Sequence, residues 1–426
     1  MDRRSFLKMS AAAGLSLLSP VFNRPAHANR TRYEGPFFLL VHAEGGWDPT
    51  YLCDPKGDPI NRLYPRSAIG AAGPFRFAPI RYPGDAYTSP YSNEEFFTKH
   101  GSRLLAVNGI DVGTGNHLPG VRASWSGTLS EGYPTFGALA ASALTPGNPL
   151  GFISSGGYEH TAGLVPLTRV RNIDSVFRVA FPERVDPADP VHNIHTRATA
   201  DRIARAQAER LDAQLAKTTL PGPRAAMSSL HLARDGAEAL AALASALPPQ
   251  TAVDKEPNRL IQQGLVALAA FKSGVAVSAN LVYGWFDTHN NHDRDHIPQL
   301  GGLLTGLSRL FDEIDAAGLA QKVIVVVGSD FGRGPTYYAG DGKDHWNLTS
   351  MLFAGPGIAG NRVVGGTDDS QKARTFNLKT LREESSGSRI TIAHIHRSLR
   401  VLAGIDDTEP ARHYALPVEA IPVFTG

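Results

Sequence analysis

The sequence is poor in cysteine, because Cys53 is the single cysteine among 426 residues. One cysteine cannot form an internal disulfide, and it excludes a metal site built from several thiolates. Any metal ion that the chain binds must therefore be held by carboxylate oxygens and imidazole nitrogens. Both ligand types are plentiful, with 40 acidic residues and 15 histidines.

The sequence also lacks a strong net charge. Its 42 basic and 40 acidic residues give a formal net charge of +2, which provides no reason to expect nucleic acid or an anionic membrane as a partner. The apolar run at residues 9–22 is shorter than the roughly 20 residues that a membrane-spanning helix needs. We therefore expect no permanent membrane anchor.

Residues 1–28 have the pattern of an export signal. The apolar run is followed by a small-residue cleavage pattern, and it is preceded by a twin-arginine motif that consists of Arg3, Arg4, Ser5, Phe6, Leu7 and Lys8. We expect the folded protein to cross the twin-arginine translocon, to be cleaved after Ala28, and to be periplasmic or secreted. Because the removed segment carries a charge of +3, the mature chain would have a net charge of −1. Export in the folded state is also compatible with a cofactor inserted beforehand.

Buried strands alternate with helices along the mature chain, residues 29–426. Apolar runs at 37–41, 104–107, 275–282 and 323–327 are typical of buried strands, while 300–318 and 390–402 are expected helices. This rhythm predicts an α/β domain with a mostly parallel sheet sandwiched by helices. Residues 192–274 differ, because they form three alanine-rich helical stretches. These stretches are either a helical layer on the sheet or a lid over the site, and the pattern does not separate the two.

Polar side chains follow each of the four strong strands. In an open parallel sheet the carboxyl ends of the strands meet at one edge, where ligands bind. We therefore expect one site at this edge. Its carboxylates and imidazoles suit zinc, manganese or iron better than calcium, which prefers oxygen ligands alone. The candidate metal ligands are Asp48, Asp287, His289, His292, Asp330 and His345.

Three short motifs carry a family resemblance. They are Gly284-Trp285-Phe286-Asp287-Thr288-His289, Gly328-Ser329-Asp330-Phe331-Gly332-Arg333, and Asp344-His345. As an ordered set they resemble the Tat-exported bacterial family DUF1501. That family is similar to the alkaline phosphatase superfamily, which includes sulfatases, and the resemblance implies an alkaline phosphatase-like fold over most of the mature chain.

The resemblance also implies roles for the candidate residues. Asp48 and Asp330 would bind one metal ion, and Asp287, His345 and either His289 or His292 would bind a second. Such a pair of cations clamps the attacking and leaving oxygens of a phosphate or sulfate ester. Arg333 and Lys343 would add positive charge for the same anion.

Two positions depart from the superfamily pattern. Phe331 stands where a histidine is usual, so one of the metal sites would lose a ligand. The nucleophile position falls at Asn116 or His117, with Thr114 the nearest preceding hydroxyl. Asn116 could still orient an anion or a water molecule through its amide, and direct attack by water would replace the covalent step.

Two functions remain open at this stage. The first is an exported, metal-dependent hydrolase that acts on a small or polymeric phosphate, sulfate or related ester, with one or two divalent ions. The second is a noncatalytic protein that keeps the scaffold and binds an envelope polymer or a protein partner. Four tryptophans near the motifs, at positions 47, 125, 285 and 346, are compatible with core packing or with a sugar-stacking platform.

Overall fold

The computed structural model describes residues 32–425, except 85–90, 147, 149, 171–172, 182, 187–188, 190, 221–222, 224–226, 228–236, 250–251 and 254. The expected export signal, residues 1–28, lies outside the described residues. Within the described ranges, no helix combines the length and the apolar character needed to cross a membrane.

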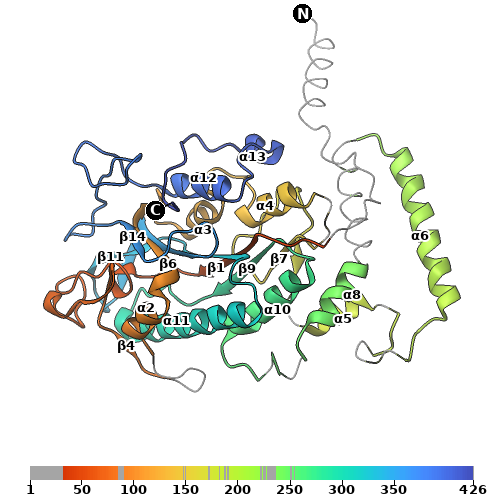
Figure 1. Ribbon diagram of the computed structural model, residues 1–426, viewed down its shortest axis with the longest axis horizontal. Coiled ribbons are helices and arrows are strands. Elements are labelled where there is room, and N and C mark those ends of the chain that lie inside the picture. Colours follow the sequence, from red (N-terminus) through yellow and green to blue (C-terminus); the bar gives the residue numbers. More distant parts are fainter. Residues whose placement is uncertain are drawn as a thin grey trace, which may run out of the picture.

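An eight-stranded sheet forms the centre of the molecule (Figure 1). In order across the sheet, its strands are β14 (Arg362–Gly365), β6 (Leu104–Asp111), β13 (Leu348–Ala354), β10 (Val323–Ser329), β1 (Phe37–Ala43), β9 (Ser278–Tyr283), β7 (Phe152–Ser154) and β8 (Thr168–Arg169). The strand β13 pairs antiparallel with both neighbours, whereas every other pairing in this sheet is parallel. The predicted mostly parallel α/β fold is confirmed.

Helices cover both faces of this sheet (Figure 1). One face carries α2 (Asn93–His100), α10 (Arg259–Ser273) and α11 (His292–Ala316), and the other carries α3 (His117–Ser126), α4 (Phe136–Leu144), α12 (Ile392–Leu402) and α13 (Glu409–His413). All of β1 is buried, and alternate residues serve the two cores: Leu39 faces the first and Leu40 the second. Burial on both faces explains why β1 is an unbroken apolar run.

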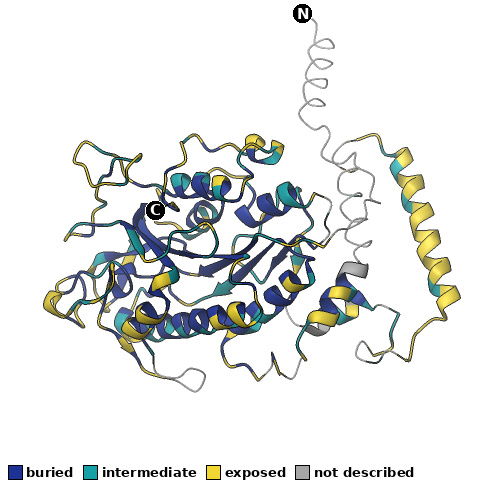
Figure 2. Cartoon of the chain, viewed as in Figure 1, coloured by how far each residue is buried: buried dark blue, intermediate teal, exposed yellow. Residues whose placement is uncertain are grey.

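The middle of the chain divides into two parts. Helix α10 packs against α11 and β9, and α8 (Ala237–Ala246) packs against α10 and α5 (Ile173–Ala180). In contrast, α6 (Arg197–Lys217) has no buried residue and stands at the end of the molecule opposite β11 (Figures 1 and 2). Thus α10 belongs to the helical layer on the sheet, and α6 does not cover the edge where β11 lies.

Several elements around the sheet are short. They are β2 (Gly70–Ala72), β3 (Phe75–Phe77), β4 (Arg81–Tyr82), β5 (Tyr91–Ser92), and the 3-10 turns Pro49–Tyr51, Arg66–Ala68 and Gly101–Arg103. One hairpin matters for the site, because β11 (Gly332–Tyr337) and β12 (Lys343–Trp346) pair antiparallel beyond the end of β10. The helix expected from residue 300 begins earlier, at His292, so His292 and His296 lie one turn apart on α11.

Candidate metal centre

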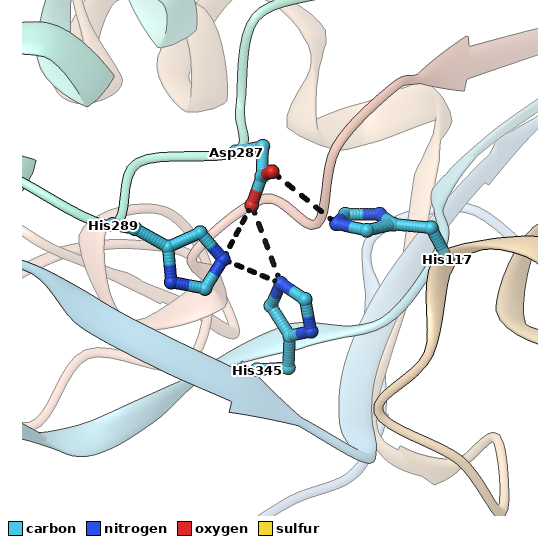
Figure 3. A group of neighbouring side chains, drawn as sticks. All are labelled: His117, Asp287, His289 and His345. Carbon is cyan, nitrogen blue, oxygen red and sulfur yellow. Dashed lines mark hydrogen bonds and ion pairs between the residues drawn. The ribbon is translucent and has the colours of Figure 1, made fainter.

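Four side chains from three separate segments meet at the carboxyl edge of the sheet. They are His117, the first residue of α3 after β6, Asp287 and His289 in the loop after β9, and His345 on β12. One ligand atom from each lies within 4.8 Å of all the others. Asp287 sits between His117 on one side and the pair His289 and His345 on the other (Figure 3). Asp287 is exposed and the histidines are half-buried, so the cluster is open to solvent.

The histidines present their Nε2 atoms to the Asp287 carboxylate. Asp287 Oδ1 lies 2.9 Å from His289 Nε2 and 3.3 Å from His345 Nε2, while Oδ2 lies 3.4 Å from His117 Nε2. The Nε2 atoms of His289 and His345 are 2.8 Å apart. Three imidazole nitrogens and a carboxylate are a ligand set that zinc and related transition metals accept.

Each imidazole is held in this orientation through its other nitrogen. His117 Nδ1 lies 2.6 Å from Asp330 Oδ2, and His345 Nδ1 lies 2.6 Å from the Gly115 carbonyl oxygen. His289 Nδ1 lies 2.7 Å from the Tyr338 hydroxyl. Metal-binding histidines are usually fixed in this way, because the outer partner sets both the tautomer and the ring orientation.

The outer partners of the imidazoles fix where their protons lie. The Gly115 carbonyl can only accept, so His345 Nδ1 donates, which leaves Nε2 as the nitrogen that can present a lone pair. By the same reasoning His117 Nδ1 donates to Asp330, and its buried Nε2 has no hydrogen-bond partner among the described residues. When these rings are neutral, their Nε2 lone pairs face a carboxylate, an arrangement that either a metal ion or a proton would stabilise. These residues fit a divalent metal ion.

The charges behind the cluster support this arrangement. Burial alone would raise the pKa of Asp330, but hydrogen bonds from His117 and His42 bring that pKa well below its ordinary value. The hydrogen bond to Asp330 in turn raises the pKa of His117. Burial also opposes ionisation of Asp287, and the hydrogen bond and charge of Arg333 lower its pKa. Both carboxylates are thus ionised at neutral pH.

A second network of similar residue types lies buried nearby. Asp48, His292, His296 and Lys343 are each fully buried. Asp48 Oδ1 accepts from the backbone and hydroxyl of Thr50 at 2.9 and 2.6 Å, and Oδ2 accepts from Lys343 Nζ at 2.7 Å and His292 Nε2 at 3.1 Å. The structure therefore places Asp48 and His292 with each other, and not with the exposed cluster.

The hydrogen bonds of this buried network form a closed ring. The Asp48 backbone N–H donates to His296 Nε2 at 2.9 Å, and His296 Nδ1 donates to the Thr288 hydroxyl at 3.1 Å. The hydroxyl donates to His292 Nδ1 at 2.6 Å, and His292 Nε2 donates to the Asp48 carboxylate. Burial lowers the pKa of both histidines, which keeps them neutral. The Lys343 ammonium balances Asp48, whose pKa is lowered by that charge against the opposing effect of burial.

Arg333 separates the two groups of residues. Its side chain is fully buried and donates to the carbonyl oxygens of Gly45, Gly46 and Lys343, and its Nη2 lies 2.7 Å from Asp287 Oδ1. The resemblance implied that Arg333 meets the substrate anion. The structure instead engages Arg333 inside the protein, where it positions Asp287.

The two other expected catalytic residues, Thr114 and Asn116, both precede His117 in the chain. Thr114 Oγ1 accepts the backbone N–H of Asn116 at 3.1 Å, as a turn residue does. Asn116 is exposed and immediately precedes α3. Neither is among the four clustered ligands.

Some functional residues were not expected as ligands or supports. His117 was considered only for the nucleophile position, although its place after β6 was a usable signal. Gly115 and Tyr338 support the cluster through a carbonyl and a hydroxyl, and no local pattern marks such roles. Phe331 is fully buried, with its ring centroid 4.9 Å from that of His117 and 4.4 Å from that of His345. It packs against two of the clustered histidines, at the position where the superfamily pattern has a histidine.

The tryptophans split between packing and exposure. Trp47 and Trp125 are buried, and Trp346 donates to the Gln371 carbonyl. Trp285 is 79% exposed, two residues before Asp287. Its φ of +79° is unusual for a residue with a side chain. Strained backbone of this kind clusters at functional sites.

The family model described as "Protein of unknown function (DUF1501)" matches residues 38–409. A search of curated proteins finds no match.

Solved structures show distant similarity. A lipoteichoic acid synthase from Listeria monocytogenes is 7% identical, with 93% of this chain and 80% of that one covered at a TM-score of 0.38. The PsFucS1 sulfatase from Pseudoalteromonas sp. is 10% identical, with 91% and 73% covered at a TM-score of 0.35. An alkaline phosphatase superfamily protein from Vibrio parahaemolyticus is 7% identical, with 93% and 76% covered at a TM-score of 0.35.

Proposed function

The chain belongs to the DUF1501 family, and we propose that it is an exported, metal-dependent hydrolase of a phosphate, sulfate or related ester. The proposal rests on the convergence of His117, Asp287, His289 and His345. All three imidazoles direct Nε2 to one carboxylate and are fixed through Nδ1. The cluster is open to solvent, so water could reach an ion held there and add to its four protein ligands, which supports a catalytic role.

The protein's own groups would hold and orient the reacting partners. A divalent zinc, manganese or iron ion bound by the four ligands would supply Lewis acidity toward an ester oxygen and activate water as a nucleophile. Arg333 holds Asp287 in place, and Asp330 holds His117. We propose a single ion for each chain, since the lone pairs of Asp48 are already taken by Thr50, His292 and Lys343.

Direct attack by water fits the surrounding hydroxyl groups better than a covalent intermediate. Ser124 and Ser126 donate to the carbonyl oxygens of Asp330 and Arg122, and Ser329 donates to that of Ala43. These serines are engaged in holding the backbone. Asn116, exposed at the start of α3 beside His117, is placed to orient an anion through its amide.

Metal analysis of the folded protein tests the proposal most directly. We expect protein purified without chelator to carry one transition-metal ion per chain, and we expect Asp287→Ala to lose it. His195→Ala is a matched control, because His195 is exposed and lies outside the cluster. Wild-type protein that binds none of zinc, manganese or iron would refute the hydrolase proposal.

An ester screen tests the reaction. Nitrophenyl phosphate, bis(nitrophenyl) phosphate and nitrophenyl sulfate separate monoester, diester and sulfate hydrolysis. We expect turnover of at least one of them that requires both the metal ion and Asp287. Turnover that persists in Asp287→Ala or after chelation would contradict the assignment.

Two exposed apolar side chains support the alternative function. Leu118 and Trp285 are 80% and 79% exposed, and each lies one or two residues from a candidate ligand. Exposed apolar groups beside a site favour binding of an envelope polymer or a protein partner. Glycan or partner binding that survives both Asp287→Ala and chelation, without ester turnover, would favour this noncatalytic function.

Export is also a proposal. It rests on Arg3 and Arg4 before the apolar run of residues 9–22. We expect fractionation to recover the protein outside the cytoplasm, and we expect Arg3→Lys with Arg4→Lys to retain it in the cytoplasm. Export of that double variant would exclude the twin-arginine route.

A further inference from the structure

A second cavity, distinct from the metal centre, opens at the end of β14. Its volume is about 360 Å³, within the range of small-molecule sites. One part of its wall is apolar and includes Ile69, Pro74, Val363 and Phe376, and the rest is charged. None of the four clustered metal ligands lines it.

The cavity lies where parallel sheets bind ligands. Gly365 is the last residue of β14, which runs parallel to β6 at the edge of the sheet, and both Gly365 and Gly366 line the cavity. Ligands bind outside the carboxyl ends of such strands. A Cβ on Gly366 would meet nothing nearer than Arg374 Cδ at 4.0 Å, so the backbone there is accessible.

Positive charge exceeds negative charge in the wall. The basic residues are Lys56, Arg66, Arg76 and Arg374, and the acidic residues are Asp54, Asp369 and Glu383. Three ion pairs join Lys56 to Asp54, Arg66 to Asp369, and Arg374 to Glu383. The Arg76 side chain forms no ion pair or hydrogen bond within the ranges that the structure describes. One guanidinium is therefore uncompensated.

The paired cations differ in how free they are to bind a ligand. Lys56 Nζ is buried and fixed by Asp54 at 2.8 Å and by the Thr367 carbonyl at 3.1 Å. The side chains of Arg66 and Arg374 are 52% and 40% exposed. Exposed ion pairs contribute little free energy, so these guanidinium groups can turn toward an incoming anion. Together with Arg76 they would match a pair of oxygens of a carboxylate, phosphate or phosphonate.

We propose that this cavity binds a small molecule that joins an anionic oxygen group to a compact apolar body. The anionic group would contact Arg76 with Arg66 or Arg374, and the apolar body would lie against Ile69 and Phe376. The cavity binds its ligand without covalent chemistry. Its thiol, Cys53, is buried, and burial raises the pKa of this group to about 12.

Titration calorimetry with phenylphosphonate tests this site. The probe carries an oxyanion on an apolar ring and has no ester bond to hydrolyse. We expect saturable binding that weakens as salt is added. We expect Arg76→Ala to weaken this binding by at least about tenfold. Arg81→Ala is the matched control, because Arg81 is exposed and does not line the cavity. Benzyl alcohol, which lacks the anion, should not bind.

The same probe distinguishes this cavity from the metal centre. Binding in the cavity should persist in His345→Ala, whereas any phenylphosphonate held at the metal centre should be lost. If wild-type protein does not bind the probe, or if binding is unchanged in Arg76→Ala, the inference is wrong and the proposed hydrolase function is unaffected. If the binding that persists in His345→Ala is lost in Arg76→Ala, the cavity site holds even where no metal is found.

Discussion

The exposed cluster around Asp287 and the buried network around Asp48 contain the same residue types but differ in their surroundings. Around Asp48, every imidazole nitrogen has a partner, and Lys343 balances the carboxylate. Around Asp287, the Nε2 atoms of His117, His289 and His345 converge on an exposed carboxylate. Composition therefore does not identify a metal centre. What marks the Asp287 cluster as the candidate is its exposure to solvent and the convergence of three Nε2 atoms on one carboxylate.

Burial explains the division. A carboxylate removed from water needs a close opposite charge, and Lys343 provides it from within the chain. Asp287 also has a fixed cation, Arg333 Nη2 at 2.7 Å, but its carboxylate remains exposed to solvent. The buried network stabilises the fold, and the exposed cluster remains free to bind an exchangeable ion.

Removing Lys343 should have the largest effect and should act on stability alone. Lys343→Met leaves the Asp48 carboxylate buried without its cation, which should cost about 3–5 kcal/mol of unfolding free energy. The double variant Asp48→Asn with Lys343→Met removes both charges and should recover much of that loss. Denaturant unfolding measures both. If folded Lys343→Met loses its metal ion, the two groups are not independent.

Removing His345 should produce the opposite pattern. We expect His345→Ala to lower metal affinity by at least about 100-fold, since loss of a direct ligand should exceed the 10–100-fold effect of an outer partner. The unfolding free energy without metal should change by about 1 kcal/mol or less. His413→Ala, at an exposed position on α13, serves as control. A large loss of stability in metal-free His345→Ala would remove the contrast between the two groups.

Asp330 should show an intermediate effect, because it acts through His117. Asp330→Asn keeps the shape of the side chain and removes the charge that holds the ring. We expect metal affinity to fall about 10–100-fold, measured by competition with a chelator of known affinity. Unchanged affinity would show that His117 is not a ligand.

The pH dependence of metal binding should separate the groups further. The hydrogen bond to Asp330 raises the pKa of His117 above its ordinary value of 6.5. A proton on Nε2 competes with the metal ion, so affinity should be full above that raised pKa. It should fall up to tenfold per pH unit below it. Chelator competition between pH 5.5 and pH 8.5 follows this change, and Asp330→Asn should shift it to lower pH.

Trp285 should have the smallest effect, on substrate binding alone. Trp285→Ala removes an exposed ring beside Asp287 without touching a ligand. We expect KM for an aryl or sugar ester to rise by about fivefold, as loss of about 1 kcal/mol of stacking would produce. Metal content should be unchanged and Trp285→Phe should retain most of the binding. A lower kcat with unchanged KM would count against this role.

The sequence predicts the buried strands and the polar residues that follow them better than it predicts which distant side chains pair. The apolar strands and the polar residues after them were evident, and the structure brings Asp287, His289 and His345 together. Pairing of Lys343 with Asp48 spans 295 positions, and no local pattern encodes it. The hairpin of β11 and β12 was also missed, because its strands are short and partly polar. The start of α11 at His292 was hidden by Pro298, which normally marks a helix boundary.

The reversed strand β13 has a consequence for how the site acquires its ion. The chain leaves the sheet along β10, forms the hairpin that carries His345, and re-enters along β13, the neighbour of β10. Both ends of the hairpin therefore continue into adjacent strands of the sheet. This restricts the movement of His345, which lies on the second strand of the hairpin. If the cluster binds an ion as we propose, its ligands are already in position, so loading should require little rearrangement. Hydrogen exchange of the β11 and β12 amides should then be nearly the same before and after loading.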